Sequence, residues 1–207
     1  FLLGADALAE LANGSNVKRQ DKYVFAYLLD YSDEKYNLLT LLCTMLNCES
    51  VIVTDPNHAV EPAWKDHAHT DYCLEDWLWL FKNAEYVLTD SFHGMCISLI
   101  FNKNFTAVVN QKRGAARFND YADLLGLHDY ILQSAAISEN EDFCLSEVDY
   151  KRVNKAIEDG VRQGMSWLYE ALNSEEVHPL TPFDVDICNM YNRNRKKLSY
   201  KLLNSKP

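Results

Sequence analysis

Residues 86–94 read Tyr86-Val-Leu-Thr-Asp-Ser-Phe-His-Gly94 and join a predicted strand to a predicted helix. The strand, Tyr86–Thr89, is apolar and ends at a polar turn, and apolar residues at 92–101 form the helix. In open α/β sheets the carboxyl end of a strand and the amino end of a helix meet at such a turn, where free backbone N–H groups point outward. The stretch therefore predicts ligand chemistry at this turn, with His93 at its rim.

The alternation of strands and helices extends to both sides of this stretch. Continuous apolar runs, which are typical of strands buried on both faces, predict further strands at 23–29, 50–54, 105–109 and 130–132. Helical spacing of apolar residues predicts helices at 1–12, 74–81 and 118–125. A further helix is predicted to begin after an expected N-cap at Asp33. The polar segment 55–73 between them is expected to be a long loop. This order predicts an α/β fold, a Rossmann-like parallel sheet flanked by helices.

The C-terminal part of the chain differs from the rest. A long amphipathic helix is predicted at 150–173, and a last, basic helix at about 185–203 after two prolines. We expect a Rossmann-like domain at 1–148, which holds the predicted ligand site. At 149–207 we expect extra C-terminal helices that pack on this domain or cross to an absent N-terminal domain of the same protein. An absent part is expected because the chain begins at Phe1 rather than Met.

Charge and composition exclude several classes of function. The 20 Lys+Arg against 30 Asp+Glu give a formal net charge of −10, which argues against general binding to nucleic acid or to an anionic membrane. No apolar run reaches the length of a membrane span, and no secretory signal opens the chain. The six cysteines show no CxxC spacing and sit mostly in apolar helical patterns, as reduced thiols do. We therefore expect a cytoplasmic protein.

The residues around the central turn resemble the polysaccharide pyruvyl transferase family. The resemblance rests on Trp77-Leu, on residues 82–94 and 98–105, and then on Arg113, Arg117-Phe118 and Leu124-Leu-Gly-Leu127. It covers about 20–135, and a Met at position 95 replaces the small residue usual in the family. The family resembles two-domain GT-B enzymes with two Rossmann-like halves, so the resemblance implies that this chain is the C-terminal half.

The resemblance implies a reaction and gives His93 a role in it. A pyruvyl ketal would pass from phosphoenolpyruvate to a sugar of a surface polysaccharide, as part of exopolysaccharide biosynthesis, without a cofactor. His93 would be the catalytic residue, which binds the phosphate or acts as an acid; the alternative is a histidine that only caps the helix. Ser91 would be an N-cap, a phosphate ligand or both, and Gly94 would allow close backbone approach.

Three charged residues complete the predicted site. Arg113 and Arg117 are expected in the loop after the fourth strand, on the same sheet edge as His93. Arg117 is the better candidate for a bidentate clamp on phosphate or carboxylate, with a salt bridge that holds the loop as the equal alternative. Asp90 could contact substrate, but a structural turn residue is the favoured interpretation. For Asp30 and Tyr31, which could line the same rim, a loop cap is favoured.

No metal is expected. The polar segment holds His58, His67, His69, Asp71 and Cys73, but their spacing matches no established metal motif. The partners expected are a small anionic donor and a saccharide acceptor.

Two other functions fit the same fold. One is a GT-B glycosyltransferase that uses a nucleotide-sugar, and the other is a ligand-binding module without catalysis. Whether the chain is competent for catalysis alone is left open by the sequence.

Overall fold

The computed structural model describes residues 4–30, 32–54, 68–69, 71–111, 114–136, 145 and 147–173. The chain forms two compact units, residues 1–163 and residues 164–207. The division predicted at residue 148 stays a prediction, because most of the second part lies outside the described residues. The last predicted helix, at about 185–203, lies outside them as well.

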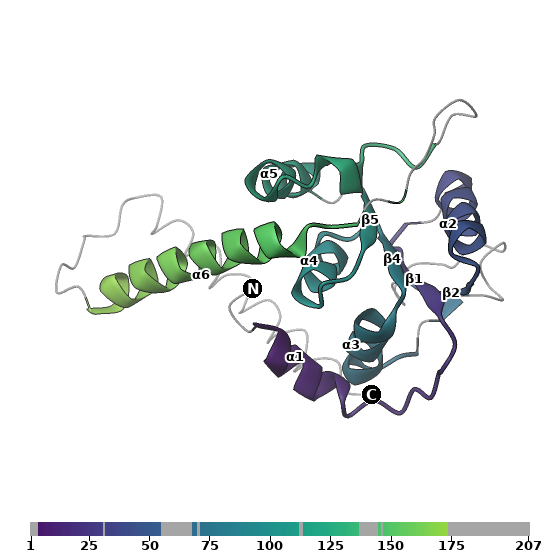
Figure 1. Ribbon diagram of the computed structural model, residues 1–207, viewed down its shortest axis with the longest axis horizontal. Coiled ribbons are helices and arrows are strands. Elements are labelled where there is room, and N and C mark those ends of the chain that lie inside the picture. The colour runs from purple at the N-terminus through teal and green to yellow at the C-terminus, as the bar shows by residue number, and fades with distance from the viewer. Residues whose placement is uncertain are drawn as a thin grey trace, which may run out of the picture. The chain divides into compact units, whose positions relative to one another are not determined.

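A parallel sheet of six strands forms the centre of the described chain, which confirms the predicted Rossmann-like α/β class (Figure 1). The strand order is β3-β2-β1-β4-β5-β6, which is the order of Rossmann folds. Every neighbouring pair is parallel. The strands are β1 Tyr23–Tyr27, β2 Glu49–Val53, β3 Ala68–His69, β4 Tyr86–Thr89, β5 Phe105–Val108 and β6 Ile131–Leu132.

Helices cover both faces of the sheet. In Figure 1, α2 lies on one side of the strands and α3, α4 and α5 lie on the other. Because α4 and α5 each follow a strand of the sheet, both begin at the carboxyl edge. The helices are α1 Gly4–Ala12, α2 Asp33–Leu46, α3 Leu74–Asn83, α4 Phe92–Ile100, α5 Ala115–Leu125, the 3-10 turn η1 His128–Tyr130 and α6 Tyr150–Asn173.

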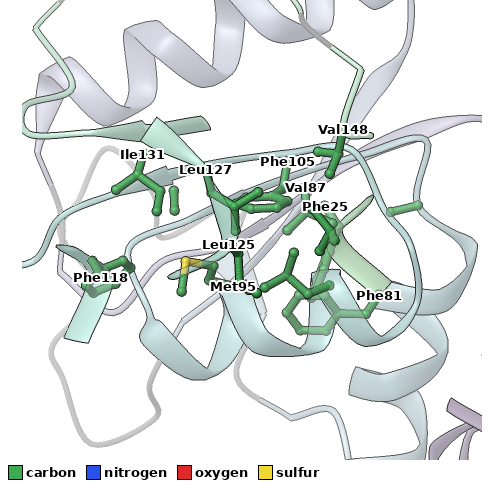
Figure 2. Packing of buried hydrophobic residues seen from close by; sticks show 14 of the residues in the cluster. Phe25, Phe81, Val87, Met95, Phe105, Phe118, Leu125, Leu127, Ile131 and Val148 are labelled. Carbon is green, nitrogen blue, oxygen red and sulfur yellow. The ribbon is translucent and has the colours of Figure 1, made fainter. Parts of the chain in front are cut away.

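Alternate residues of β1, β2, β4, β5 and β6 face two separate cores. The larger core packs Phe25 and Val87 of the sheet against Phe81 of α3 and Met95 of α4 (Figure 2). The smaller core packs strand residues of the opposite face against α2. Since the central strands are buried on both faces, their sequences are mostly apolar, with buried threonines at positions 89 and 106.

Three details differ from the prediction. The segment 55–73 was expected to be entirely loop, yet it contributes β3, which at two residues is too short to leave a sequence pattern. Ser32, not Asp33, is the N-cap of α2, and its hydroxyl accepts a hydrogen bond from the N–H of Lys35 at 3.3 Å. Finally, α5 begins at Ala115, so Arg117 lies in a helix and not in a loop.

Within the described residues, no helix combines the length and the apolar character that crossing a membrane requires.

Candidate functional site

The carboxyl ends of β1, β4 and β5 lie side by side at one edge of the sheet. The register pairs Tyr27 of β1 with Thr89 of β4, and Thr89 with Ala107 of β5. Polar residues follow each strand end: Asp30 after β1, Asp90 after β4 and Asn110 after β5. The strand order reverses between β1 and β4, and folds of this type bind ligands at that point.

Asp90 connects the ends of β1 and β4 by hydrogen bonds. Its side chain is buried, and its Oδ1 accepts a hydrogen bond from the N–H of Leu29 at 2.6 Å. Its Oδ2 accepts from the N–H of Asp30 at 3.1 Å and from Nζ of Lys35 at 2.6 Å. Lys35 also donates to the carbonyl oxygen of Asp30 at 2.8 Å. We call these four residues the β1–β4 junction; their contacts support the structural interpretation of Asp90.

Gly94 allows α4 to lie directly on the sheet. A Cβ atom at this position would stand 2.3 Å from Oγ1 of Thr89 and 3.2 Å from the ring of Tyr27. Thr89 Oγ1 itself is fixed, because it donates to the carbonyl of Tyr27 at 2.8 Å and accepts from the N–H of Ser91 at 3.1 Å. The close backbone approach expected at Gly94 is therefore one between α4 and the strands β1 and β4.

Ser91 caps the amino end of α4. Its hydroxyl accepts a hydrogen bond from the N–H of Gly94 at 3.4 Å, and its backbone is extended, as N-cap residues require. The first-turn N–H groups of a helix have no partner within the helix, and they carry a partial positive charge. The amino end of α4 therefore favours a negative ligand at the sheet edge.

Two basic side chains lie near Phe92. His93 is exposed in the first turn of α4, and its ring centroid is 6.2 Å from that of Phe92. Arg117 is exposed in the first turn of α5, and its guanidinium carbon stands 4.8 Å from the centroid of the Phe92 ring. We call Phe92, His93 and Arg117 the α4–α5 rim, where the structure brings together two of the residues predicted for the site.

Gly114 shapes the rim from the start of α5. Its φ of +89° is a left-handed conformation that favours glycine, and it precedes the first residue of the helix. A Cβ atom there would stand 2.8 Å from Nη2 of Arg117. Gly114 therefore leaves the space that the guanidinium group occupies, a role that the sequence pattern alone did not indicate.

The thiol of Cys96, one turn after His93 on α4, is not a nucleophile at neutral pH. Burial raises its pKa to about 11, and the charge of Arg117 acts in the opposite direction. The thiol therefore stays protonated, and the chemistry of the rim is left to His93 and Arg117.

Several predicted residues are not placed at this site by the described part of the chain. Arg113 and Tyr31 lie outside the described residues, as do His58 and His67 of the polar segment. His69, in β3, packs against Tyr72 with ring centroids 5.3 Å apart. In the part of the chain that the structure describes, no three His, Cys, Asp or Glu side chains are grouped so that they could hold a metal ion.

Lys35 and Asn110 are further residues of this edge that the sequence analysis does not identify. Asn110 is 6 % exposed and donates from Nδ2 to Oδ2 of Asp30 at 2.6 Å. Its position directly after an apolar strand is the same signal that marked Asp90. Lys35 carries no such signal, because its partner is distant in the sequence.

A comparison with known families gives one match. The family model described as polysaccharide pyruvyl transferase matches residues 5–112, just over half of the 207-residue chain. The matched range includes the β1–β4 junction and His93, and it ends before Arg113 and Arg117. No curated protein and no solved structure matches the chain.

Proposed function

The chain belongs to the polysaccharide pyruvyl transferase family, and we propose that it takes part in the transfer of a pyruvyl ketal from phosphoenolpyruvate to a sugar of a surface polysaccharide. The observation that carries this proposal is the α4–α5 rim. An exposed histidine at one helix amino end and an exposed arginine at the next both lie near one aromatic ring. Such an arrangement suits a small ligand with several negative charges.

The donor needs three things that the rim can supply. Phosphoenolpyruvate carries a phosphate and a carboxylate, and its methylene carbon must receive a proton. In our proposal His93 binds the phosphate or protonates the methylene carbon, because an imidazole can donate a hydrogen bond and can act as a general acid. Arg117 clamps the phosphate or the carboxylate with its planar fork, and Ser91 and Gly94 hold the first turn of α4 in place. Arg113 remains a further candidate for the clamp.

The turn after β1 argues against the rival that uses a nucleotide-sugar. Rossmann-type dinucleotide sites place the pyrophosphate at a glycine-rich turn between the first strand and the first helix. Here that turn, residues 28–32, contains no glycine and contains Asp30, and Asp33 opens the helix. A turn without glycine lacks the close backbone approach that such a pyrophosphate site uses, so the favourable place for an anion is the α4–α5 rim.

We place the reaction in the cytoplasm, as a proposal. Cys43, Cys48, Cys73 and Cys96 are free thiols in the structure, which suits a reducing compartment. The two-domain GT-B arrangement, with this chain as one half, likewise stays a prediction.

Thermal shift with a set of ligands tests the proposal. We expect phosphoenolpyruvate to raise the melting temperature of the chain more than inorganic phosphate does, and UDP- and GDP-sugars to have no effect. His93→Ala should abolish most of this shift. His128→Ala is the matched control, because His128 is exposed on η1, where it pairs with Asp123 at 3.1 Å. If only a nucleotide-sugar raised the melting temperature, this proposal would be wrong and the glycosyltransferase function would be favoured.

A further inference from the structure

A polar pair, Asp30 and Asn110, joins the ends of β1 and β5, the two strands on either side of β4. We propose that Asp30 and Asn110 bind the diol of the acceptor sugar, and that Asp30 receives the proton of the attacking hydroxyl. This inference rests on the proposed function and adds the acceptor half of the site to it.

The position of the pair follows from the strand order. β4 lies between β1 and β5, and neighbouring strands are about 4.8 Å apart, so the ends of β1 and β5 are separated by about 10 Å. The side chains of Asp30 and Asn110 span this distance and meet at 2.6 Å. The pair therefore lies across the carboxyl end of β4, where the chain turns into α4 and leads to His93.

The main chain of Asp30 is fixed on both sides. Its N–H donates to Asp90 and its carbonyl accepts from Lys35, whose side chain is only 12 % exposed. Asn110 is itself buried. A carboxylate held by a network of this kind is preorganised, as a group that meets a reacting hydroxyl must be.

Exposure separates the two carboxylates at this edge. Asp90 is 1 % exposed, and both its oxygens accept hydrogen bonds within the β1–β4 junction. Asp30 is half-buried and reaches the surface of the site. Of the two, Asp30 is the one that a ligand can touch.

Hydrogen bonding indicates what kind of ligand fits there. A carboxylate oxygen accepts hydrogen bonds, and a neutral sugar hydroxyl can donate one to Asp30. The amide of Asn110 can both donate and accept, so the pair offers matched partners to two hydroxyls of one sugar. A pyruvate ketal requires two hydroxyls of the acceptor, which is the pattern that such a pair can hold.

The chemistry balances when both halves of the site act. In the first step the oxygen of one hydroxyl bonds to the central carbon of phosphoenolpyruvate, Asp30 takes the hydroxyl proton, and protonated His93 gives a proton to the methylene carbon, which becomes a methyl group. In the second step the oxygen of the other hydroxyl bonds to the same carbon, and the carbon–oxygen bond to phosphate breaks. The second hydroxyl proton leaves with the phosphate, and Asp30 returns its proton through solvent to His93.

The test is saturation-transfer NMR on the full chain, with and without phosphoenolpyruvate. The probes are the methyl β-glycopyranosides of galactose, glucose and mannose, each with free hydroxyls at C4 and C6. Their benzylidene acetals, in which these two hydroxyls are blocked, are the matched control ligands. We expect a signal from at least one free glycoside, none from its acetal, and a decrease of about tenfold in Asp30→Asn, because a hydrogen bond to a charged group is lost.

A second variant separates binding from folding. Asp30→Asn combined with Asn110→Asp keeps a carboxylate–amide pair across β4 but moves the charge to the other strand end. We expect a melting temperature near that of the wild type and a glycoside signal as low as that of Asp30→Asn. The inference is overturned if the exchange restores the signal, if Asp30→Asn keeps it, or if no free glycoside binds the wild type.

Calorimetry with phosphoenolpyruvate on the same samples separates this inference from the proposed function. If phosphoenolpyruvate binds but Asp30→Asn does not change glycoside binding, the acceptor site is wrong and the proposed function still stands. If glycoside binding depends on Asp30 but phosphoenolpyruvate does not bind, the diol site is supported and the proposed pyruvyl transfer is wrong.

Discussion

The β1–β4 junction and the α4–α5 rim share one edge of the sheet, but they hold their charges in opposite ways. In the junction, the side chains of Asp90 and Lys35 are 0 % and 12 % exposed, and they neutralise each other at 2.6 Å. In the rim, His93 and Arg117 are exposed and are arranged around the ring of Phe92. This contrast indicates that the buried charges fix the geometry of the edge, while the exposed ones lie at the surface, where a ligand can reach them.

The largest effect is expected for Lys35→Met, which tests whether the junction is structural. The substitution leaves the carboxylate of Asp90 buried without its cation, which costs about 3–5 kcal/mol of unfolding free energy. Urea unfolding measures it. The control is Lys22→Met, because Lys22 pairs with Glu85 at 3.1 Å on the surface and should cost less than about 1 kcal/mol. Equal losses of unfolding free energy in the two variants would contradict a structural role of the buried charges.

Gly94→Ala should have the next largest effect. The added Cβ atom meets the side chain of Thr89, which hydrogen bonds hold in place, so α4 must move away from the sheet at a cost of about 1–3 kcal/mol. Gly160→Ala on α6 is the control of opposite sign. A Cβ atom there meets nothing within 4 Å, and replacing a mid-helix glycine stabilises by roughly 0.5–1 kcal/mol. A Gly94→Ala protein as stable as the wild type would contradict the close packing.

Much of this arrangement could be predicted from the sequence, and the reasons are physical. The alternation of buried strands and helices determines a parallel sheet, and a parallel sheet brings its strand ends to one edge. For this reason the turn at residues 86–94 and the position of His93 could be found without coordinates. Thr89, Asp90 and Ser91 follow an apolar run directly, and each performs a local task at that turn.

The pairings across the edge could not be predicted. Lys35 and Asp90 are 55 positions apart, and Asp30 and Asn110 are 80 apart, so only the strand order brings them together. Arg117 was assigned to a loop because the left-handed cap at Gly114, which starts α5 early, has no counterpart in apolar periodicity. Periodicity records which residues are buried, and it carries no information on which polar groups meet.

Arg117→Ala should have a small effect on stability and a larger one on the ligand. Loss of the cation–π contact with Phe92 costs at most about 1 kcal/mol at an exposed site. The affinity for phosphoenolpyruvate, measured by calorimetry, should decrease about tenfold, because a charge-assisted hydrogen bond is lost. Arg162→Ala is the control, since Arg162 is exposed on α6 and pairs with Asp159 at 2.8 Å. Equal affinities in the two variants would show that Arg117 does not bind the donor.

The central claim is that the donor binds at the α4–α5 rim, and the imidazole resonances of the six histidines test it most directly. The signals of His93 are identified as those missing from the spectrum of His93→Ala, a variant whose stability should stay within about 0.5 kcal/mol of the wild type because the side chain is exposed. We predict that phosphoenolpyruvate shifts the His93 signals more than those of the other five histidines. Saturation with phosphoenolpyruvate that leaves the His93 signals in place would contradict the account.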